Sequence, residues 1–231
     1  HQGWPKYVQN LWYATNSGGV AVSFYAPSSV QMKVRNGVSV TISEQTMYPF
    51  SDDIVFTIES IDKQEYFPFS FRIPQWSEST RIELTGEEFP LAVNQNGVAT
   101  VERKGRKKDQ IKIKFSPEVK LSVWKENSRS VERGPLVYAL NMESKKEKHE
   151  PLSNNPFDIY YTYTSDSSWN YALLDVPADK LQAAYDFTYE ENDINNINNP
   201  WQNPPCKITT KGRKVLTWRK YNGMAGPLPY S

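Results

Sequence analysis

The chain has 231 residues, enough for one large β domain or two smaller ones, and its 27 basic and 26 acidic residues give a formal net charge of +1. This balance, spread along the sequence, excludes the strong field that would recruit nucleic acid or an anionic membrane. No run approaches the roughly 20 consecutive apolar residues of a membrane span, and the single cysteine, Cys206, excludes an internal disulfide and a multi-cysteine metal site. We expect a soluble chain with no nucleic-acid or membrane partner.

The first segment predicts a short helix over residues 4–13. Pro5 stands at a plausible first helical turn, and Val8, Leu11 and Trp12 fall on one helical face. A helix of this length is marginal in isolation, so its apolar stripe must lie against another part of the protein.

From Gly19 onward apolar residues recur at every second position, which predicts β-strands. Asn36 and Gly37 separate two β-rich runs, 30–34 and 38–43, and this dipeptide tolerates the positive φ that tight hairpins need. A hairpin is therefore predicted there. Further strands bounded by turn residues are predicted at 54–58, 67–73, 80–84, 98–102 and 111–115.

The second half is again rich in β-forming residues and punctuated by Gly and Pro. Strands are predicted at 121–124, 130–140, 171–174, 183–189, 206–210 and 215–218, and the polar stretch 143–155 predicts a surface loop. Such dense short strands are typical of sandwiches. We expect an all-β fold with two consecutive β-sandwich domains, at 18–118 and 119–231, preceded by a short N-terminal helix within 1–17.

Catalytic and metal-binding patterns are missing from the sequence. A Ser-His-Asp or Cys-His system needs a histidine beside the nucleophile, and the chain offers only His1 and His149. Glycosidases can instead use two carboxylates across a cleft. The candidate acids fall at predicted turns or on polar strand faces, where they keep a surface solvated: Asp52, Asp53, Glu59, Glu87, Glu88, Asp175, Asp186 and Glu190. No catalytic residue and no metal site are assigned.

Aromatic residues are abundant, with seven Trp and fourteen Tyr. Sugar rings have apolar faces that stack on flat aromatic side chains, so tryptophans near turns are candidates for a carbohydrate platform. The candidates are Trp76, Trp169, Trp201 and Trp218. Core packing or contact between domains is the alternative explanation for each of them.

Seven short stretches, in order along the whole chain, resemble glycoside hydrolase family 127, the beta-L-arabinofuranosidase family formerly described as a domain of unknown function. They are 1–6 (HQGWPK), 11–15 (LWYAT), 25–28 (YAPS), 71–76 (FRIPQW), 132–140 (ERGPLVYAL), 168–173 (SWNYAL) and 226–229 (GPLP). One such stretch would mean little, but seven in order are a specific signal.

The resemblance implies that an upstream (α/α)6 barrel of the same polypeptide carries the active site, with a zinc-bound cysteine as nucleophile and a glutamate as acid/base. Cys206 does not match that motif, so none of these roles transfers to a residue here, and no cofactor is expected in this chain. Residues 1–17 would be the helical remnant of the barrel, and the second sandwich, ending near 226–229, would lack its last strand. The resemblance favours a periplasmic or secreted protein and leaves glycan binding and homo-oligomers open.

We therefore expect a non-catalytic, accessory β-sandwich region of a beta-L-arabinofuranosidase-like glycoside hydrolase, which supports the catalytic barrel in carbohydrate degradation. The alternative is an independent carbohydrate-binding module that holds a glycan with exposed aromatic residues. A self-sufficient glycosidase using two turn carboxylates ranks last.

Overall fold

The computed structural model describes residues 2–150, 159–190 and 204–229. By internal contacts the chain divides into two compact units: residues 1–119, 133–136 and 188–207 form the first, and 120–132, 137–187 and 208–231 form the second. The predicted domain boundary near residue 118 stays a prediction. None of the described helices is long and apolar enough to cross a bilayer.

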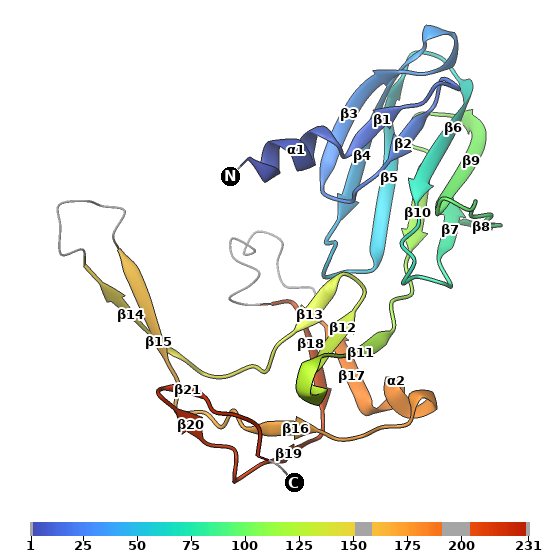
Figure 1. The fold of residues 1–231 in the computed structure, drawn as a ribbon. Coiled ribbons are helices and arrows are strands. Elements are labelled where there is room, and N and C mark those ends of the chain that lie inside the picture. The colour runs from blue at the N-terminus through green and yellow to red at the C-terminus, as the bar shows by residue number, and fades with distance from the viewer. Residues whose placement is uncertain (1, 151–158, 191–203, 230–231) are drawn as a thin grey trace. The chain divides into compact units, whose positions relative to one another are not determined.

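The first unit begins with a short helix and continues in strands (Figure 1). Its elements are α1 (Gly3–Gln9), β1 (Trp12–Ala14), β2 (Val20–Val22), β3 (Ser28–Lys33), η1 (Arg35–Gly37), β4 (Ser39–Thr46), β5 (Asp53–Ile61), β6 (Glu65–Arg72), β7 (Arg81–Leu84), β8 (Glu87–Phe89), β9 (Val98–Gly105) and β10 (Gln110–Lys114). They form a four-stranded sheet, in the order β1-β2-β6-β9, and a six-stranded sheet, in the order β3-β4-β5-β10-β7-β8. The pairing of β2 with β6 is parallel, which was not predicted.

The two sheets enclose one hydrophobic core. Along β4 and β5 buried and partly exposed residues alternate, because successive side chains of a strand point to opposite faces. Phe56 from the large sheet packs on Phe69 and Phe71 from the small one, with ring centroids 5.3 Å apart in both pairs. The first unit is therefore a β-sandwich whose inner faces are joined by aromatic rings.

The predicted hairpin at Asn36 and Gly37 is confirmed. Both residues adopt positive φ, 56° and 68°, and β3 pairs with β4 from Lys33 opposite Ser39 to Ser28 opposite Glu44. Glu126 and Asn127 build a second turn with positive φ, 56° at each residue, and this turn was not recognised because it lacks glycine.

The predicted N-terminal helix is too long at its carboxyl end. α1 ends at Gln9, and Trp12 instead pairs with Val22 in the β1–β2 ladder. Leu11 is buried, whereas Val8 is 62% exposed, so the three apolar residues do not share one helical stripe. A helix of this length is only marginally stable on its own, and residues 12–14 pair with β2 instead of extending it.

The rest of the chain, which includes the second unit, forms smaller sheets. The remaining elements are β11 (Val119–Val123), η2 (Lys125–Asn127), β12 (Arg129–Arg133), β13 (Leu136–Tyr138), β14 (Lys145–His149), β15 (Tyr160–Thr164), β16 (Tyr171–Leu173), η4 (Ala178–Lys180), α2 (Leu181–Ala184), β17 (Tyr185–Tyr189), β18 (Cys206–Thr210), β19 (Gly212–Lys214), β20 (Lys220–Tyr221) and β21 (Met224–Ala225). β11, β12 and β13 form a three-stranded sheet, and the later strands pair two by two. The all-β prediction is confirmed.

Two local predictions in this half are wrong. The polar stretch 143–155 was predicted as a loop, but β14 pairs with β15 from Lys145 to His149. Residues 215–218, predicted as a strand, form a turn closed by a hydrogen bond from the Trp218 N–H to the Val215 carbonyl. Cross-strand tyrosine partners stabilise the charged strand, and its lysine-rich sequence gave no apolar alternation by which to recognise it.

Candidate functional site

Two of the tryptophans proposed for carbohydrate contact, Trp169 and Trp218, lie together in the second unit. Their ring centroids are 4.9 Å apart and their planes meet at 65°, an edge-to-face arrangement. The Trp218 Nε1–H donates to the Gly226 carbonyl at 2.7 Å, and the Asn170 side-chain amide donates to the Val215 carbonyl, also at 2.7 Å. Each ring already packs against the other, and both side chains are half-buried. Each ring therefore offers only part of its surface to a sugar.

The other two candidates do not join this pair. Trp76 belongs to the first unit, where its ring packs edge-on against Phe115 at 5.3 Å beside the hydrophobic core. That packing explains Trp76 without a ligand. Trp201 lies outside the described residues. The role of all four as carbohydrate contacts stays a prediction.

A more exposed aromatic surface, missed by the sequence reasoning, lies on the β14–β15 hairpin. Tyr161 and Tyr163 are 46% and 61% exposed. Both lie on one face of the hairpin with Lys146, whose ammonium is 4.1 Å from the Tyr161 ring centroid and 5.8 Å from that of Tyr163. The alternation of Tyr and Thr from Tyr161 to Thr164 was the available signal.

The candidate acids of the sandwich are engaged in local contacts. Asp52 forms a bidentate ion pair with Arg133, and Asp53 lies 3.8 Å from the Lys112 ammonium. Glu59 accepts a hydrogen bond from the Ser43 hydroxyl. Within the part of the chain that the structure describes, no three His, Cys, Asp or Glu side chains are grouped closely enough to hold a metal ion.

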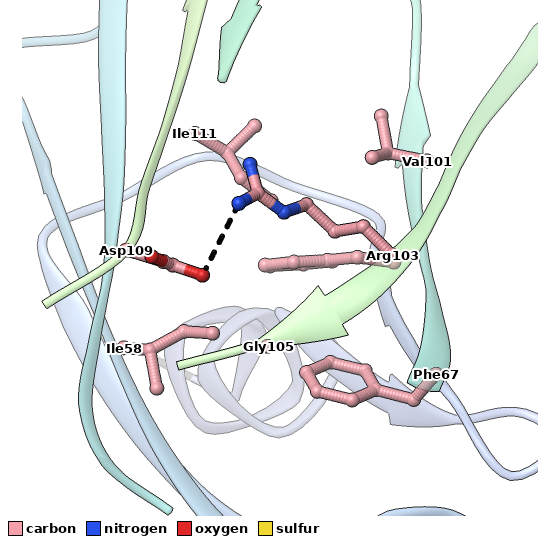
Figure 2. A pocket seen from close by; sticks show the side chains of 8 residues that line it. Ile58, Phe67, Val101, Arg103, Gly105, Asp109 and Ile111 are labelled. Carbon is pink, nitrogen blue, oxygen red and sulfur yellow. Dashed lines mark hydrogen bonds and ion pairs between the residues drawn. The ribbon is translucent and has the colours of Figure 1, made fainter. Parts of the chain in front are cut away.

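Glu87 and Glu88, two further candidate acids, line an open groove beside the β7–β8 hairpin. Its cavity volume is about 300 Å³, and Leu84, Thr85, Phe89 and Arg103 complete its lining. A second cavity, of about 10 Å³, is lined by residues of both sheets of the sandwich (Figure 2). It has room for about one water molecule.

The small cavity sits beside an ion pair. Arg103 from β9 reaches toward Asp109, with 3.4 Å between Nη2 and Oδ2, between Ile111 on one side and Ile58 and Phe67 on the other (Figure 2). Gly105 approaches the same space, because a Cβ on it would lie only 2.8 Å from the Phe67 ring. The cavity is too small for a sugar.

Glu44, which the sequence reasoning did not single out, is the charged residue that the described fold buries most deeply. It is 2% exposed and occupies an inward position of β4, in phase with Val40 and Ile42. One carboxyl oxygen, Oε1, accepts from the Ala26 N–H at 3.0 Å, and Oε2 lies 3.2 Å from the Ser28 hydroxyl. An acid in phase with core residues of a predicted strand was the signal that could have revealed it.

Burial raises the pKa of the Glu44 carboxyl to about 8, because a charged carboxylate loses its hydration there; the hydrogen bonds from Ser28 and Ala26 act in the opposite direction. Burial likewise raises the pKa of Tyr7, Tyr25 and Tyr48, and the Glu44 charge adds to the effect at Tyr7 and Tyr25. The Tyr25 hydroxyl donates to the Arg72 carbonyl at 2.6 Å. These groups form a polar core at one side of the sandwich.

Comparisons with known proteins show similarity for the sandwich of the first unit. Residues 19–116 match the family model described as "Beta-L-arabinofuranosidase, GH127 middle domain". Among solved structures, the chain resembles Ara127N-Se, a GH127 beta-L-arabinofuranosidase from Geobacillus stearothermophilus T6, with 22% identity and a TM-score of 0.51 over 72% of this chain and 30% of that one. This likeness shows a shared fold. No curated protein sequence matches the chain.

Two further solved structures are similar over parts of the chain. One, described as a GH127 beta-arabinofuranosidase, has 18% identity and a TM-score of 0.49 over 87% of this chain and 32% of that one. The other, described as a glycoside hydrolase, has 23% identity and a TM-score of 0.49 over 55% of this chain and 22% of that one. In all three comparisons the chain spans less than a third of the solved protein.

Proposed function

We propose that the chain, whose residues 19–116 match the GH127 beta-L-arabinofuranosidase middle domain, is the non-catalytic β-sandwich region of such a glycoside hydrolase. Its role in this proposal is to support a catalytic domain of the same polypeptide during carbohydrate degradation. The zinc and the nucleophilic cysteine implied by the family resemblance belong, in the proposal, to that catalytic domain. The match of residues 19–116 is the observation that carries the proposal.

The local chemistry of the sandwich supports a structural role. Hydrolysis of a glycoside by carboxyl groups needs two of them facing each other across the sugar, roughly 5–10 Å apart. Asp52 is instead engaged by a guanidinium in two hydrogen bonds, Glu59 accepts from a hydroxyl, and Asp53 lies 3.8 Å from an ammonium. The bidentate contact of Asp52 supports a structural role for that carboxylate.

The proposal is tested by assaying this chain on an aryl beta-L-arabinofuranoside beside a polypeptide that also carries the catalytic barrel. We expect turnover only from the longer polypeptide. Turnover by this chain alone, retained after further purification, would overturn the non-catalytic role.

The supporting role has its own test in the longer polypeptide. A substitution that destabilises the sandwich should lower the temperature at which activity is lost and leave kcat at low temperature unchanged. Gly19→Ala is suited to this, because a Cβ at residue 19 would lie 2.2 Å from the Pro68 carbonyl oxygen. An unchanged inactivation temperature, with the sandwich shown to melt earlier, would contradict support of the barrel.

A further inference from the structure

A chain of hydrogen bonds joins β1 to the large sheet around Ser28. The Trp12 Nε1–H donates to the Ser28 Oγ at 3.0 Å, and that hydroxyl lies 2.9 Å from the Ala26 carbonyl oxygen. The same hydroxyl is 3.2 Å from the Glu44 Oε2, and the Ala26 N–H donates to the Glu44 Oε1 at 3.0 Å. Four residues from β1, β3, β4 and the segment between β2 and β3 therefore share one network.

Whether every acceptor in this network has a donor depends on the protonation state of the Glu44 carboxyl. A serine hydroxyl has one hydrogen to donate and two lone pairs, whereas an indole N–H can only donate and a carbonyl can only accept. If Glu44 is ionised, the single Ser28 hydrogen faces two acceptors, the Ala26 carbonyl and the Glu44 carboxylate, and one of them is left without a donor. If Glu44 carries a proton on Oε2, all contacts are satisfied: Trp12 and Glu44 donate to Ser28, and Ser28 donates to Ala26.

We propose that Glu44 is a neutral carboxylic acid in the folded protein and donates the hydrogen bond that completes the attachment of Trp12 and Ser28 to β4. The attachment is then strongest while the acid keeps its proton and weakens when the proton is lost. This inference is independent of the proposed function.

The surroundings of Glu44 favour the neutral form. The titratable groups that interact with it are the hydroxyls of Tyr7 from α1 and Tyr25 after β2, and Tyr48 after β4 packs on Tyr25; all three hydroxyls are neutral at physiological pH. Arg72, at the end of β6, acts electrostatically on Tyr25 and Tyr48, and its guanidinium lies 5.9 Å from the Phe24 ring centroid. Among the described residues no cation forms an ion pair with Glu44. An isolated buried carboxylate of this kind is more stable protonated.

The neutral form gives the stability of the protein a definite pH dependence. The carboxyl pKa rises from 4.5, the ordinary value, to about 8 in the fold. Between these values the folded state holds a proton that the unfolded state releases, so raising the pH favours unfolding. Below the lower value both states are protonated and above the higher value both are ionised, and this group then adds no further slope.

The test compares the wild type with Glu44→Gln, whose amide imitates the neutral acid by donating to Ser28 and accepting from Ala26. We expect the variant to melt at a higher temperature than the wild type at pH 7, and the two melting temperatures to converge near pH 4.5. The unfolding constant of the wild type, relative to the variant, should rise up to about tenfold per pH unit within this window. A variant that is less stable than the wild type at pH 7 would show that Glu44 is ionised and overturn the proposal.

Two further measurements test whether a change in stability of Glu44→Gln comes from the protonation of Glu44. Glu59→Gln removes an exposed carboxylate that accepts a hydrogen bond from Ser43, and we expect it to show no gain in stability at pH 7. In the unsubstituted protein, the 13C chemical shift of the Glu44 carboxyl should change with a midpoint near the folded pKa of about 8. A midpoint near the ordinary value of 4.5 would overturn the proposal, whatever the variants do.

Discussion

The guanidinium of Arg133 meets the carboxylate of Asp52 in two parallel hydrogen bonds, 3.1 Å from Nη1 to Oδ1 and 2.7 Å from Nη2 to Oδ2. The two side chains are only 14% and 25% exposed. The planar guanidinium matches a carboxylate in this geometry, which a lysine ammonium cannot reproduce. The pair fastens the end of β12 to the segment that precedes β5, within the first unit.

Breaking this pair should cost stability. We expect Arg133→Lys and Asp52→Asn each to lower the free energy of unfolding by about 1–3 kcal/mol. The lysine cannot form both parallel hydrogen bonds, and the asparagine leaves a partly buried guanidinium without an anionic partner. Denaturant unfolding of both single variants and of the double variant measures the coupling between the two residues. Lys145 and Asp166, paired at 3.4 Å but 83% and 93% exposed, provide the matched control, for which no measurable coupling is expected. Equal coupling in the two pairs would refute the structural role of Arg133.

Gly19 should tolerate no side chain. A Cβ there would lie 2.2 Å from the Pro68 carbonyl oxygen and 2.4 Å from its Cγ, where β2 and β6 run side by side. We expect Gly19→Ala to destabilise the fold by about 1–3 kcal/mol or more through overpacking. Gly37→Ala is the control, since residue 37 has open space around it and a φ of +68°, so only backbone strain of about 1 kcal/mol should appear. Thermal unfolding of both variants measures the two losses of stability. A smaller loss for Gly19→Ala than for Gly37→Ala would contradict the close contact at residue 19.

The tryptophan pair of the second unit gives a prediction about sugar binding. Because Trp169 and Trp218 pack edge to face and are half-buried, we expect the chain to migrate without retardation in arabinan, arabinogalactan and xylan gels. Retardation that disappears in Trp169→Ala would contradict this and favour a carbohydrate-binding module. Tyr161→Ala then identifies the surface, because it alters the exposed β14–β15 face and leaves the tryptophan pair intact.

The hydrogen bond from the Trp218 Nε1–H to the Gly226 carbonyl should hold the turn at 215–218 to the segment around Gly226. Trp218→Phe keeps an aromatic ring but removes the donor, so we expect a loss of about 1 kcal/mol in stability. Trp124→Phe is the comparison, since Trp124 donates to Ser130 but is 64% exposed and water can replace its partner. Denaturant unfolding that shows a larger loss at Trp124 would contradict the ranking.

Much of the first unit was predictable because local sequence and final packing agree there. Asn36 and Gly37 need a tight turn, the flanking runs alternate, and the β3–β4 hairpin satisfies both requirements. The parallel contact of Val20 with Phe69 was not predictable, because no local pattern specifies a partner that far along the chain. In the second unit, β14 escaped recognition because its strand character depends on tyrosines in β15 rather than on its own lysines.

The candidate site was predictable only in part. A high aromatic content directed attention to Trp169 and Trp218, whose carbohydrate contact stays a prediction, but the sequence could not show that the two rings would pack edge to face. Glu44 was overlooked because an acidic residue in a strand is normally assigned to the solvent-exposed face. Only the register of β4 places its side chain in the core of the sandwich. An acidic residue at the same alternate positions as the apolar residues of a predicted strand therefore indicates a buried polar group.

The parallel alignment of β2 with β6 also affects biosynthesis. On a ribosome that adds about 5–20 residues per second, β2 emerges several seconds before the strand it must join. During that interval Val20 and Val22, both buried in the finished protein, have only β1 as a neighbour in their sheet. The nascent β1–β2 hairpin is consequently a place where a chaperone that recognises short apolar strands has time to bind.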